Sequence, residues 1–302
     1  MNILGKRYFV FGISLLLIVP GLLLMLFRGV PLSIDFTGGS LLEITFSSQA
    51  PQPAEIITLY QDSGIKDVQV QTTESGAFVI RSSFLEDAER DAILAALENS
   101  FGTLTVQRFD SVGPSIGEQV TTRGAWAVAV SSLLVVLFIA WSFRGVQNAF
   151  RYGVCAILAM IHDVAIIFSI TAIGSFFFGW EIDSLFLTAL LTVIGFSMQD
   201  TIVVFDRIRE NSAILRKLDF ETLVNHSIVQ TLQRSINTQL MTVEFLLLAL
   251  ALFGGVTLQE FAIILLVGLM SGTYSSIFIA APILVVWEKQ EWKTWFKRKA
   301  TA

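Results

Sequence analysis

Long apolar runs dominate this sequence, and most of them are long enough to cross a lipid bilayer. A transmembrane α-helix needs about 20 predominantly apolar residues. Six runs can be drawn, at Tyr8–Phe27, Gly124–Phe143, Tyr152–Phe177, Ser184–Phe205, Met241–Phe253 and Phe261–Trp287. The fifth run is the shortest, and Glu244 interrupts it. The sequence therefore predicts an α-helical membrane protein with six transmembrane helices.

The composition supports this class. Of the 302 residues, 54% are hydrophobic and only 15% are charged, and the mean hydropathy is +0.69. Soluble domains carry about 25% charged residues. A single cysteine, Cys155, rules out a disulfide within the chain. The net charge of −5 carries little meaning as a total, and no nucleic-acid partner is expected.

The distribution of charge predicts how the helices are oriented. Basic residues gather in the loops of one side, and the short loops of the other side carry acidic residues. The positive-inside rule then places both termini in the cytoplasm. We expect a first helix in residues 1–30, helices two to six in 121–288, and a basic tail in 289–302. The first run is longer than the core of a signal peptide, about 7–15 residues, so it is interpreted as an uncleaved anchor.

Residues 31–120 are polar and fall on the outer side, where they predict a small α+β domain. Period-two alternation predicts four strands, and helical spacing predicts two helices. The resulting order, βαββαβ, is that of an extracytoplasmic ferredoxin-like domain. The strands are expected at Leu41–Phe46, Asp67–Thr73, Ala77–Ser82 and Thr103–Phe109, and the helices at Pro53–Asp62 and Leu85–Asn99.

Two glycine-rich corners flank this domain, Ile34–Gly39 and Val112–Gly117. Neither has the pattern of a phosphate-binding P-loop. Both are interpreted as hinge or packing corners. On the cytoplasmic side, the stretch 208–237 mixes apolar and basic residues, which predicts amphipathic helices lying on the inner face of the membrane.

Asp200 stands out because it lies within the fourth apolar run. A carboxylate at the centre of a membrane helix costs about 2.5–3.5 kcal/mol on insertion scales, whereas each Leu or Ile contributes only about 0.3–0.6 kcal/mol. In a helix, Asp200 shares a face with Ser197 and Thr201, and Gln199 precedes it. Two interpretations stay open: a functional carboxylate inside the membrane, or one near the helix end that reaches water.

Other ionisable groups at membrane depth are candidate partners. His162 and Asp163 lie near the middle of the third run, and Arg234 lies just before the fifth. A buried charge needs a partner, and an Asp200–Arg234 pair is the simplest one. Asp200 could then exchange a proton as its distance from Arg234 changes. The alternative is a static polar cluster that fixes the register of the helices. Glu244 is either a further relay group or a partner of His162.

Five motifs are spread over nearly the whole chain. They are Ile34–Gly39 (IDFTGG), Val112–Gly117 (VGPSIG), His162–Val164 (HDV), Gln199–Asn211 (QDTIVVFDRIREN) and Gly268–Pro282 (GLMSGTYSSIFIAAP). Together they resemble the SecF family of protein-export membrane subunits, within the RND superfamily. The resemblance implies six membrane helices of the RND type with an outer ferredoxin-like domain. The family usually has Asn where this chain has Gln199.

The resemblance also implies a role and partners. SecD supplies a second, pseudo-symmetric set of helices, and it is expected as a separate chain because this sequence lacks that half. The pair would use the proton motive force to help preproteins leave the SecYEG translocon after SecA has driven them in. YidC and YajC are further expected partners, and the location is the plasma (inner) membrane. Asp200 and Arg234, with Asp163 beside them, stand where the family's proton-passage residues stand; Ser197, Gln199, Thr201 and His162 would support them.

Two other functions remain open: half of an RND-type exporter of small molecules or lipids, and a non-conducting scaffold of the translocon. The sequence has no G-x-S-x-G or H-E-x-x-H motif, and its two histidines are not at metal-ligand spacing. An enzyme, a metal site and a cofactor are therefore not expected.

Overall fold

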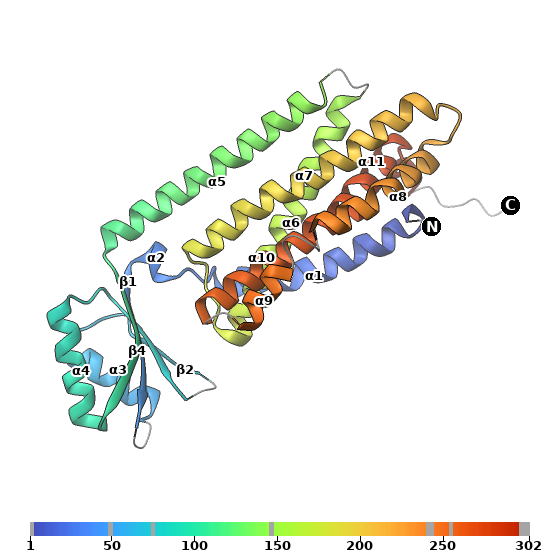
Figure 1. The fold of residues 1–302 in the computed structure, drawn as a ribbon. Coiled ribbons are helices and arrows are strands. Elements are labelled where there is room, and N and C mark those ends of the chain that lie inside the picture. Colours follow the sequence, from blue (N-terminus) through green and yellow to red (C-terminus); the bar gives the residue numbers. More distant parts are fainter. Residues whose placement is uncertain are drawn as a thin grey trace. The chain divides into compact units, whose positions relative to one another are not determined.

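The computed structural model describes residues 3–47, 51–73, 76–144, 148–239, 245–253 and 256–295. The chain divides into two compact units (Figure 1). One is Leu32–Trp126, which compares with the predicted outer domain at 31–120, and it contains the sheet. The other is helical and combines Met1–Pro31 with Ala127–Ala302.

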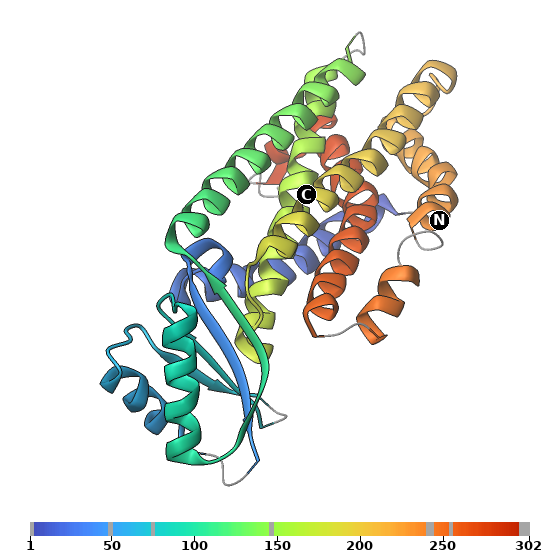
Figure 2. The same cartoon turned by 60° about the vertical axis from the view of Figure 1, so that its left-hand side comes forward.

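A four-stranded antiparallel sheet forms the centre of the smaller unit. Its spatial order is β2-β3-β1-β4. Two helices pack on one face of this sheet and contact each other (Figure 2). Chain order βαββαβ with this strand order is the predicted ferredoxin-like fold. The strands are β1 (Gly39–Phe46), β2 (Gln69–Thr72), β3 (Phe78–Ser82) and β4 (Leu104–Val112), and the helices are α3 (Pro53–Asp62) and α4 (Asp87–Phe101).

The core of this unit follows from the two periodicities of the sequence. From Leu42 onward alternate side chains of β1 are buried, and so are side chains four residues apart on each helix. All belong to one cluster of apolar side chains. Its members include Leu42, Ile44 and Phe46 of β1, Ile56 and Tyr60 of α3, and Ile93 and Leu97 of α4.

The ends of two predicted elements shift for identifiable reasons. Strand β2 starts later than predicted because Asp67 has a φ of 57°, which lies outside the extended region. Helix α4 starts after Leu85, whose side chain is buried and whose backbone N–H donates to the Ser40 hydroxyl at 2.9 Å. The helix begins instead with a capping box between Glu86 and Glu89.

The two predicted glycine corners pack against each other. Gly38 follows the short helix α2 (Ile34–Thr37) with a φ of +72°, and a Cβ there would lie 3.0 Å from the Cα of Pro114. A Cβ on Gly117 would lie 2.8 Å from the backbone nitrogen of Gly38. Only residues without a side chain allow this approach, which confirms the interpretation as packing corners.

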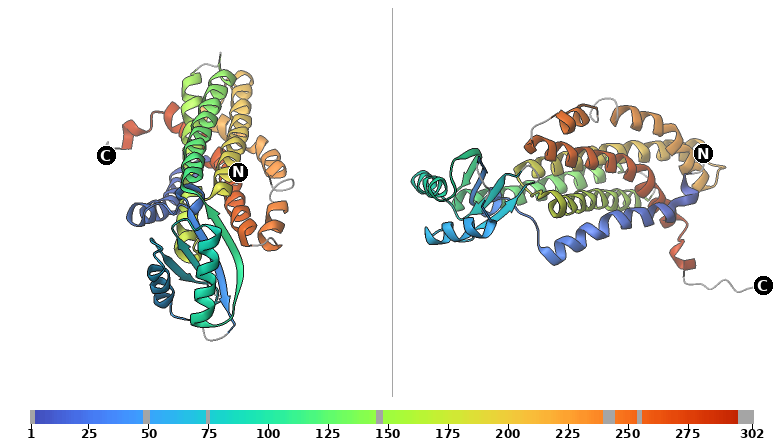
Figure 3. Two further views of the ribbon diagram at one scale, coloured as in Figure 1. Left: turned by 90° about the vertical axis from the view of Figure 1, so that its left-hand side faces the viewer. Right: turned by 90° about the horizontal axis from the view of Figure 1, so that it is seen from below.

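Five helices of the described chain are long and apolar enough to cross a membrane, at Leu4–Arg28, Pro114–Ser142, Ala149–Phe178, Ser184–Ile214 and Leu258–Glu288. Blue α1 runs along one flank of the helical unit (Figure 3). The helices, after a 3₁₀ turn at Leu4–Lys6, are α1 (Arg7–Arg28), α5 (Pro114–Ser142), α6 (Ala149–Phe178), α7 (Ser184–Ile214), α8 (Phe220–Gln239), α9 (Phe245–Phe253), α10 (Val256–Ser275), the π-helical turn η3 (Ser276–Ala280), α11 (Ala281–Glu288) and α12 (Trp292–Trp295).

The fifth predicted span, Met241–Phe253, corresponds in part to α9, which has nine residues. Residues 240–244, Glu244 among them, lie outside the described residues. Within the part of the chain that the structure describes, five helices are therefore long enough to span a membrane, and the predicted count of six spans is not confirmed.

The predicted amphipathic segment 208–237 packs on the helical unit through one of its faces. Its first residues continue α7 to Ile214, and the remainder forms α8, which packs against α7. The reason is a stripe of buried small and apolar side chains on α8, spaced three or four residues apart. This stripe comprises Val224, Ser227, Ile228, Thr231 and Ser235.

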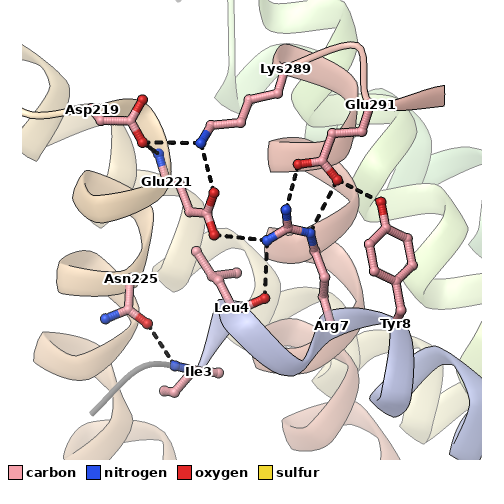
Figure 4. A network of polar contacts seen from close by, with 9 residues as sticks. All are labelled: Ile3, Leu4, Arg7, Tyr8, Asp219, Glu221, Asn225, Lys289 and Glu291. Atoms are coloured by element: carbon pink, nitrogen blue, oxygen red, sulfur yellow. Dashed lines mark hydrogen bonds and ion pairs between the residues drawn. The ribbon is translucent and has the colours of Figure 1, made fainter. Parts of the chain in front are cut away.

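A network of charged side chains joins three distant segments of the helical unit (Figure 4). Arg7 of α1 donates to Glu221 of α8 at 2.8 Å and to Glu291 at 2.5 Å. Lys289 lies between Asp219, at 3.1 Å, and Glu221, at 2.7 Å. The network therefore ties the start of α8 to the start of α1 and to the chain after α11.

Candidate functional site

Asp163 of α6 is the most enclosed carboxylate among the described residues of the helical unit, with an exposed fraction of 1%. One carboxylate oxygen accepts from the hydroxyl of Ser271 at 2.6 Å, and Nδ1 of His162 lies 3.0 Å from it. The other accepts from the hydroxyls of Ser197, at 2.5 Å, and Ser275, at 2.6 Å. Side chains of α6, α7 and α10 thus converge on one carboxylate, and both of its oxygens have two partners.

Small residues on α10 bring its serines to this position. A Cβ on Gly272 would lie 3.1 Å from the Cα of Ser197, and one on Gly268 would lie 2.5 Å from the Val193 side chain. This G-x-x-x-G spacing lets the backbones of α7 and α10 approach closely. Ser271 and Ser275 are four residues apart, so both face the same neighbour.

His162 connects Asp163 to α1 through an aromatic contact. Its ring stacks on Tyr274 with 6.0 Å between ring centroids. The Tyr274 hydroxyl lies 3.2 Å from the Ser14 hydroxyl and donates to the carbonyl of Val10 at 3.2 Å. Nε2 of His162 is buried and makes no hydrogen bond to any described residue. The alternative pairing of His162 with Glu244 falls outside the described residues.

Asp200 of α7 lies beside a different set of donors. Its exposed fraction is 9%. The Ser235 hydroxyl of α8 donates to it at 2.7 Å, and the Ser276 hydroxyl donates at 3.1 Å. Ser276 is the first residue of the π-helical turn η3, and such turns frequently occur at functional sites. The consecutive residues Ser275 and Ser276 therefore contact Asp163 and Asp200, respectively.

The predicted Asp200–Arg234 ion pair is not formed in this structure. Ser235 occupies the position of α8 that faces α7, so Arg234, one residue earlier, is turned about 100° away and is exposed. The two charged residues instead line one small cavity of about 30 Å³ with Phe196, Gln199, Val203, Thr238 and Gln239. A volume of this size can hold a water molecule.

The supporting residues predicted on α7 divide between two roles. Ser197 contacts Asp163 rather than Asp200, and Gln199 is exposed and lines the small cavity. The Thr201 hydroxyl donates to the carbonyl of Ser197 within the same helix, at 3.1 Å. Sequence reasoning missed four serines that hold the carboxylates, and the spacing of small residues within GLMSGTYSS is the signal that indicates three of them. These four are Ser235, Ser271, Ser275 and Ser276.

Comparison with known families explains the motifs. The family described as "Protein export membrane protein SecD/SecF, C-terminal" matches residues 92–290, which include both carboxylates. The chain belongs to the SecD/SecF family of protein-export membrane proteins. The "SecD/SecF GG Motif" matches residues 23–50, which include the positive-φ glycines of the packing corner.

Within the family, the chain is similar over almost its whole length to SecF subunits. The protein translocase subunit SecF of Anaerolinea thermophila is 64% identical over 302 residues, covering 99% of this chain and 98% of the relative. SecF of Thermobaculum terrenum is 43% identical, with 99% and 97% covered. The predicted resemblance to SecF is confirmed, and the chain is a membrane protein of the protein-export translocase.

A solved relative has the same fold. The crystal structure of SecDF from Thermus thermophilus, which its title calls a translocon-associated membrane protein, aligns with a TM-score of 0.80 at 33% identity. The alignment covers 96% of this chain and 39% of SecDF, so the chain spans about two fifths of that longer protein. SecDF in a super-membrane-facing form aligns with a TM-score of 0.68. In the SecDF relatives, the SecD and SecF parts belong to one chain.

Proposed function

We propose that this SecF-family chain works with a separate SecD chain and uses the proton motive force to promote late steps of preprotein translocation through SecYEG. The observation that supports this best is the pair of buried carboxylates at helix contacts. Asp163 and Asp200 are each held by hydroxyls from the same stretch, Ser271–Ser276. Ionisable groups at membrane depth are rare and mark proton or ion pathways.

Protonation of Asp200 would change what its neighbours can do. A carboxylate only accepts hydrogen bonds, whereas a protonated carboxyl also donates one. The hydroxyls of Ser235 and Ser276 donate to different oxygens of Asp200, so a proton on either oxygen removes the negative charge and weakens the hydrogen bond that this oxygen accepts. Because these serines belong to α8 and η3, the protonation state biases how both elements pack on α7.

The available energy suits such a change. One proton that crosses a potential of 100 mV supplies about 2.3 kcal/mol, which is enough to bias an equilibrium between two conformations. The small cavity between Asp200 and Arg234 supplies a place for the proton to enter or leave. In this proposal Arg234 acts across the cavity, and no enzymatic step is involved.

A second candidate function, a non-conducting scaffold, is favoured by the cluster around Asp163. Four partners saturate its oxygens, which suits a residue that fixes the register of α6, α7 and α10. We assign proton exchange to Asp200 and the anchoring of α6, α7 and α10 to Asp163, and the scaffold function is the outcome if Asp200 does not support coupling.

The orientation belongs to the same proposal. The basic loops of the sequence favour the plasma (inner) membrane with both termini in the cytoplasm. The ends of α1 and α11 meet in the network of Figure 4, so the two terminal segments lie on one side. SecYEG, the preprotein driven by SecA, and YidC and YajC are the proposed wider partners.

The test is the substitution Asp200→Asn in membranes that contain SecD and SecYEG. We expect assembly with SecD to persist while the stimulation of preprotein translocation by the proton gradient is lost. Asp206→Asn, on the same helix but exposed and paired with Arg209, is the matched control and should retain full stimulation. Full gradient-dependent translocation in the Asp200 variant would reject the coupling role and leave the scaffold.

A further inference from the structure

We propose that a basic cavity in the helical unit binds the phosphate headgroup of an anionic glycerophospholipid. The cavity has a volume of about 940 Å³ and is formed where α5, α6, α7 and α11 end or begin. This volume falls in the range of about 300–1,000 Å³ that is usual for small-molecule sites. Its lining residues are Arg144, Asn148, Tyr152, Arg209, Ser212, Ala213, Arg216, Phe220, Leu284 and Glu288.

The charges around the cavity do not balance. Three arginines line it together with a single carboxylate, Glu288. This carboxylate is already paired with Arg151. Arg144 and Arg216 have no carboxylate partner among the described residues, whereas Arg209 pairs with Asp206 at 2.6 Å. The cavity therefore presents unneutralised guanidinium groups, which match a phosphate in geometry as well as charge.

Aromatic side chains around the cavity are those expected at the level of lipid headgroups. The guanidinium of Arg144 lies over the ring of Trp141, 5.5 Å from its centroid. Tyr152 lines the cavity itself. Phe150 and Trp287 contact each other edge to face nearby. Trp and Tyr are enriched where a membrane protein meets the membrane–water interface, so this end of the bundle suits the headgroup region.

The exposed apolar face of α5 lies next to the site and forms its apolar extension. Such an extension suits a lipid, which has acyl chains, better than a free anion. A second cavity, of about 320 Å³, shares Arg144 and Arg209 with the first, and its other lining residues are Trp141, Ser142, Phe143, Ile202 and Asp206. From Trp141 the exposed face of α5 continues through large apolar side chains three or four residues apart. These are Leu134, Leu137 and Phe138. A headgroup in the basic cavity would therefore have a path for its acyl chain along α5.

The alternative occupant is an acidic segment of a partner protein. Such a segment would use the arginines but leave the apolar extension without a role. Basic pockets between membrane helices bind anionic headgroups in other membrane proteins. The combination of unpaired arginines, interfacial aromatics and an apolar path therefore favours the lipid. The inference does not depend on proton coupling, because binding can be measured without a gradient.

The experiment measures which lipids the purified full-length protein retains. Equal amounts of phosphatidylglycerol and phosphatidylcholine are supplied in detergent, and native mass spectrometry counts the bound molecules. We expect the protein to prefer phosphatidylglycerol. The double variant Arg144→Gln, Arg216→Gln should lose this preference by about fivefold for each arginine, roughly 25-fold in all.

The matched control removes the same charge from residues that do not line the cavity. Lys6→Gln with Lys217→Gln changes two exposed residues, and it should leave the preference unchanged. A third variant, Ala213→Glu, adds a carboxylate to the exposed wall of the cavity and should also weaken binding, which covers the case in which the arginine variant does not fold. Soluble glycerol phosphate, added as a competitor to the lipid, separates binding of the whole lipid from binding of phosphate alone.

Each result has a stated meaning. Loss of preference in the cavity variants, with the control unchanged and glycerol phosphate unable to compete, supports the proposal. Equal losses in the cavity variants and the control show a general surface-charge effect and overturn it. No preference in the natural sequence also overturns it and leaves an acidic partner segment as the occupant. Competition by glycerol phosphate at the lipid's own concentration reduces the site to a phosphate site.

Discussion

Asp163 and Asp200 lie in one helical unit, yet different numbers of donors surround their oxygens. Asp163 has four partners, and Asp200 has two serine hydroxyls and an adjoining cavity. A saturated carboxylate gains little from any rearrangement, because every move breaks a bond. A carboxylate with fewer donors and a cavity beside it changes state at lower cost. At the scale of single residues, Asp200 is therefore the better exchange group and Asp163 the better anchor.

The anchor role predicts a stability effect at Ser275. The substitution Ser275→Ala removes one donor from a buried carboxylate, so we expect the free energy of unfolding in detergent to fall by about 1–2 kcal/mol. Thr273→Ala is the control on the same helix, since its hydroxyl donates only weakly to its own helix at 3.5 Å. Thermal melts of both variants check the prediction, and equal melting temperatures would show that Asp163 does not depend on this donor.

The sequence alone predicts some residues of the carboxylate sites, but it does not predict which side chains contact each other. Asp200 could be found because a carboxylate in an apolar run is costly, and Ser197 because it shares a helical face with Asp200. The sequence alone does not reveal that the predicted Asp200–Arg234 pair is absent. Whether the pair forms depends on how far α8 is rotated about its own axis. That rotation turns Ser235 of α8 toward Asp200 of α7 and leaves Arg234 exposed.

At the scale of elements, close contacts between helix backbones organise the helical unit. The tightest involves Gly21 of α1, where an added Cβ would lie 2.3 Å from the Cα of Ser169 and 2.4 Å from its carbonyl oxygen. Beside it, the Ser169 hydroxyl donates to the carbonyl of Leu17 at 2.6 Å. Small residues and such hydrogen bonds are what hold membrane helices together.

The contact predicts that Gly21→Ala separates α1 from α6. Backbone atoms are in the way, so the helices must shift, and we expect a loss of about 1–3 kcal/mol in the free energy of unfolding. Gly12→Ala on the same helix is the matched control: nothing lies within 4 Å of the added Cβ, and alanine is the better helix former. Denaturant titrations in detergent would contradict the prediction if the two variants were equally stable.

Elements differ in how well a sequence predicts them. Strands β1 and β3 and helix α3 follow from clear periodicity and lie close to their predicted positions. Helix α8 was predicted as an amphipathic surface helix because its pattern mixes polar and apolar residues. Its polar positions include Ser227, Thr231 and Ser235, which are buried against neighbouring helices. Small hydroxyl residues serve helix packing in membranes as readily as they serve a solvated face, so the pattern alone does not separate the two.

At the scale of the whole molecule, the charged network of Figure 4 connects residues of the helical unit that are far apart in the sequence. Arg7 and Glu291 are 284 positions apart, and Arg7 and Glu221 are 214 apart. The Tyr8 hydroxyl also donates to Glu291, at 2.6 Å. Glu221 is central, because it accepts from both Arg7 and Lys289. The helix that carries Ser235 is thereby held at its first turn to both ends of the described chain.

The network gives the protein a pH dependence whose sign can be worked out. The hydrogen bonds from Lys289 lower the pKa of Asp219 and, with Arg7 in addition, the pKa of Glu221. Their stabilising effect is present above the unfolded pKa values, about 4, and is lost as the pH falls through the folded ones. The bond to Glu221 raises the pKa of Lys289, whose contribution is lost only as the pH rises beyond its usual value of about 10.5. The network is therefore intact from about pH 5 to 10.

Glu221→Gln tests this arrangement. At about pH 7 we expect the variant to lose about 1 kcal/mol of stability, since a partly exposed network contributes modestly. The difference from the natural sequence should shrink as the pH is lowered to about 3, because protonation removes the same charge from both proteins. Glu210→Gln breaks an exposed pair with Arg207 on α7 and should change the melting temperature little at any pH. Melting curves across this range would contradict the prediction if the Glu221 difference stayed constant, since the stabilisation would then not depend on the carboxylate charge.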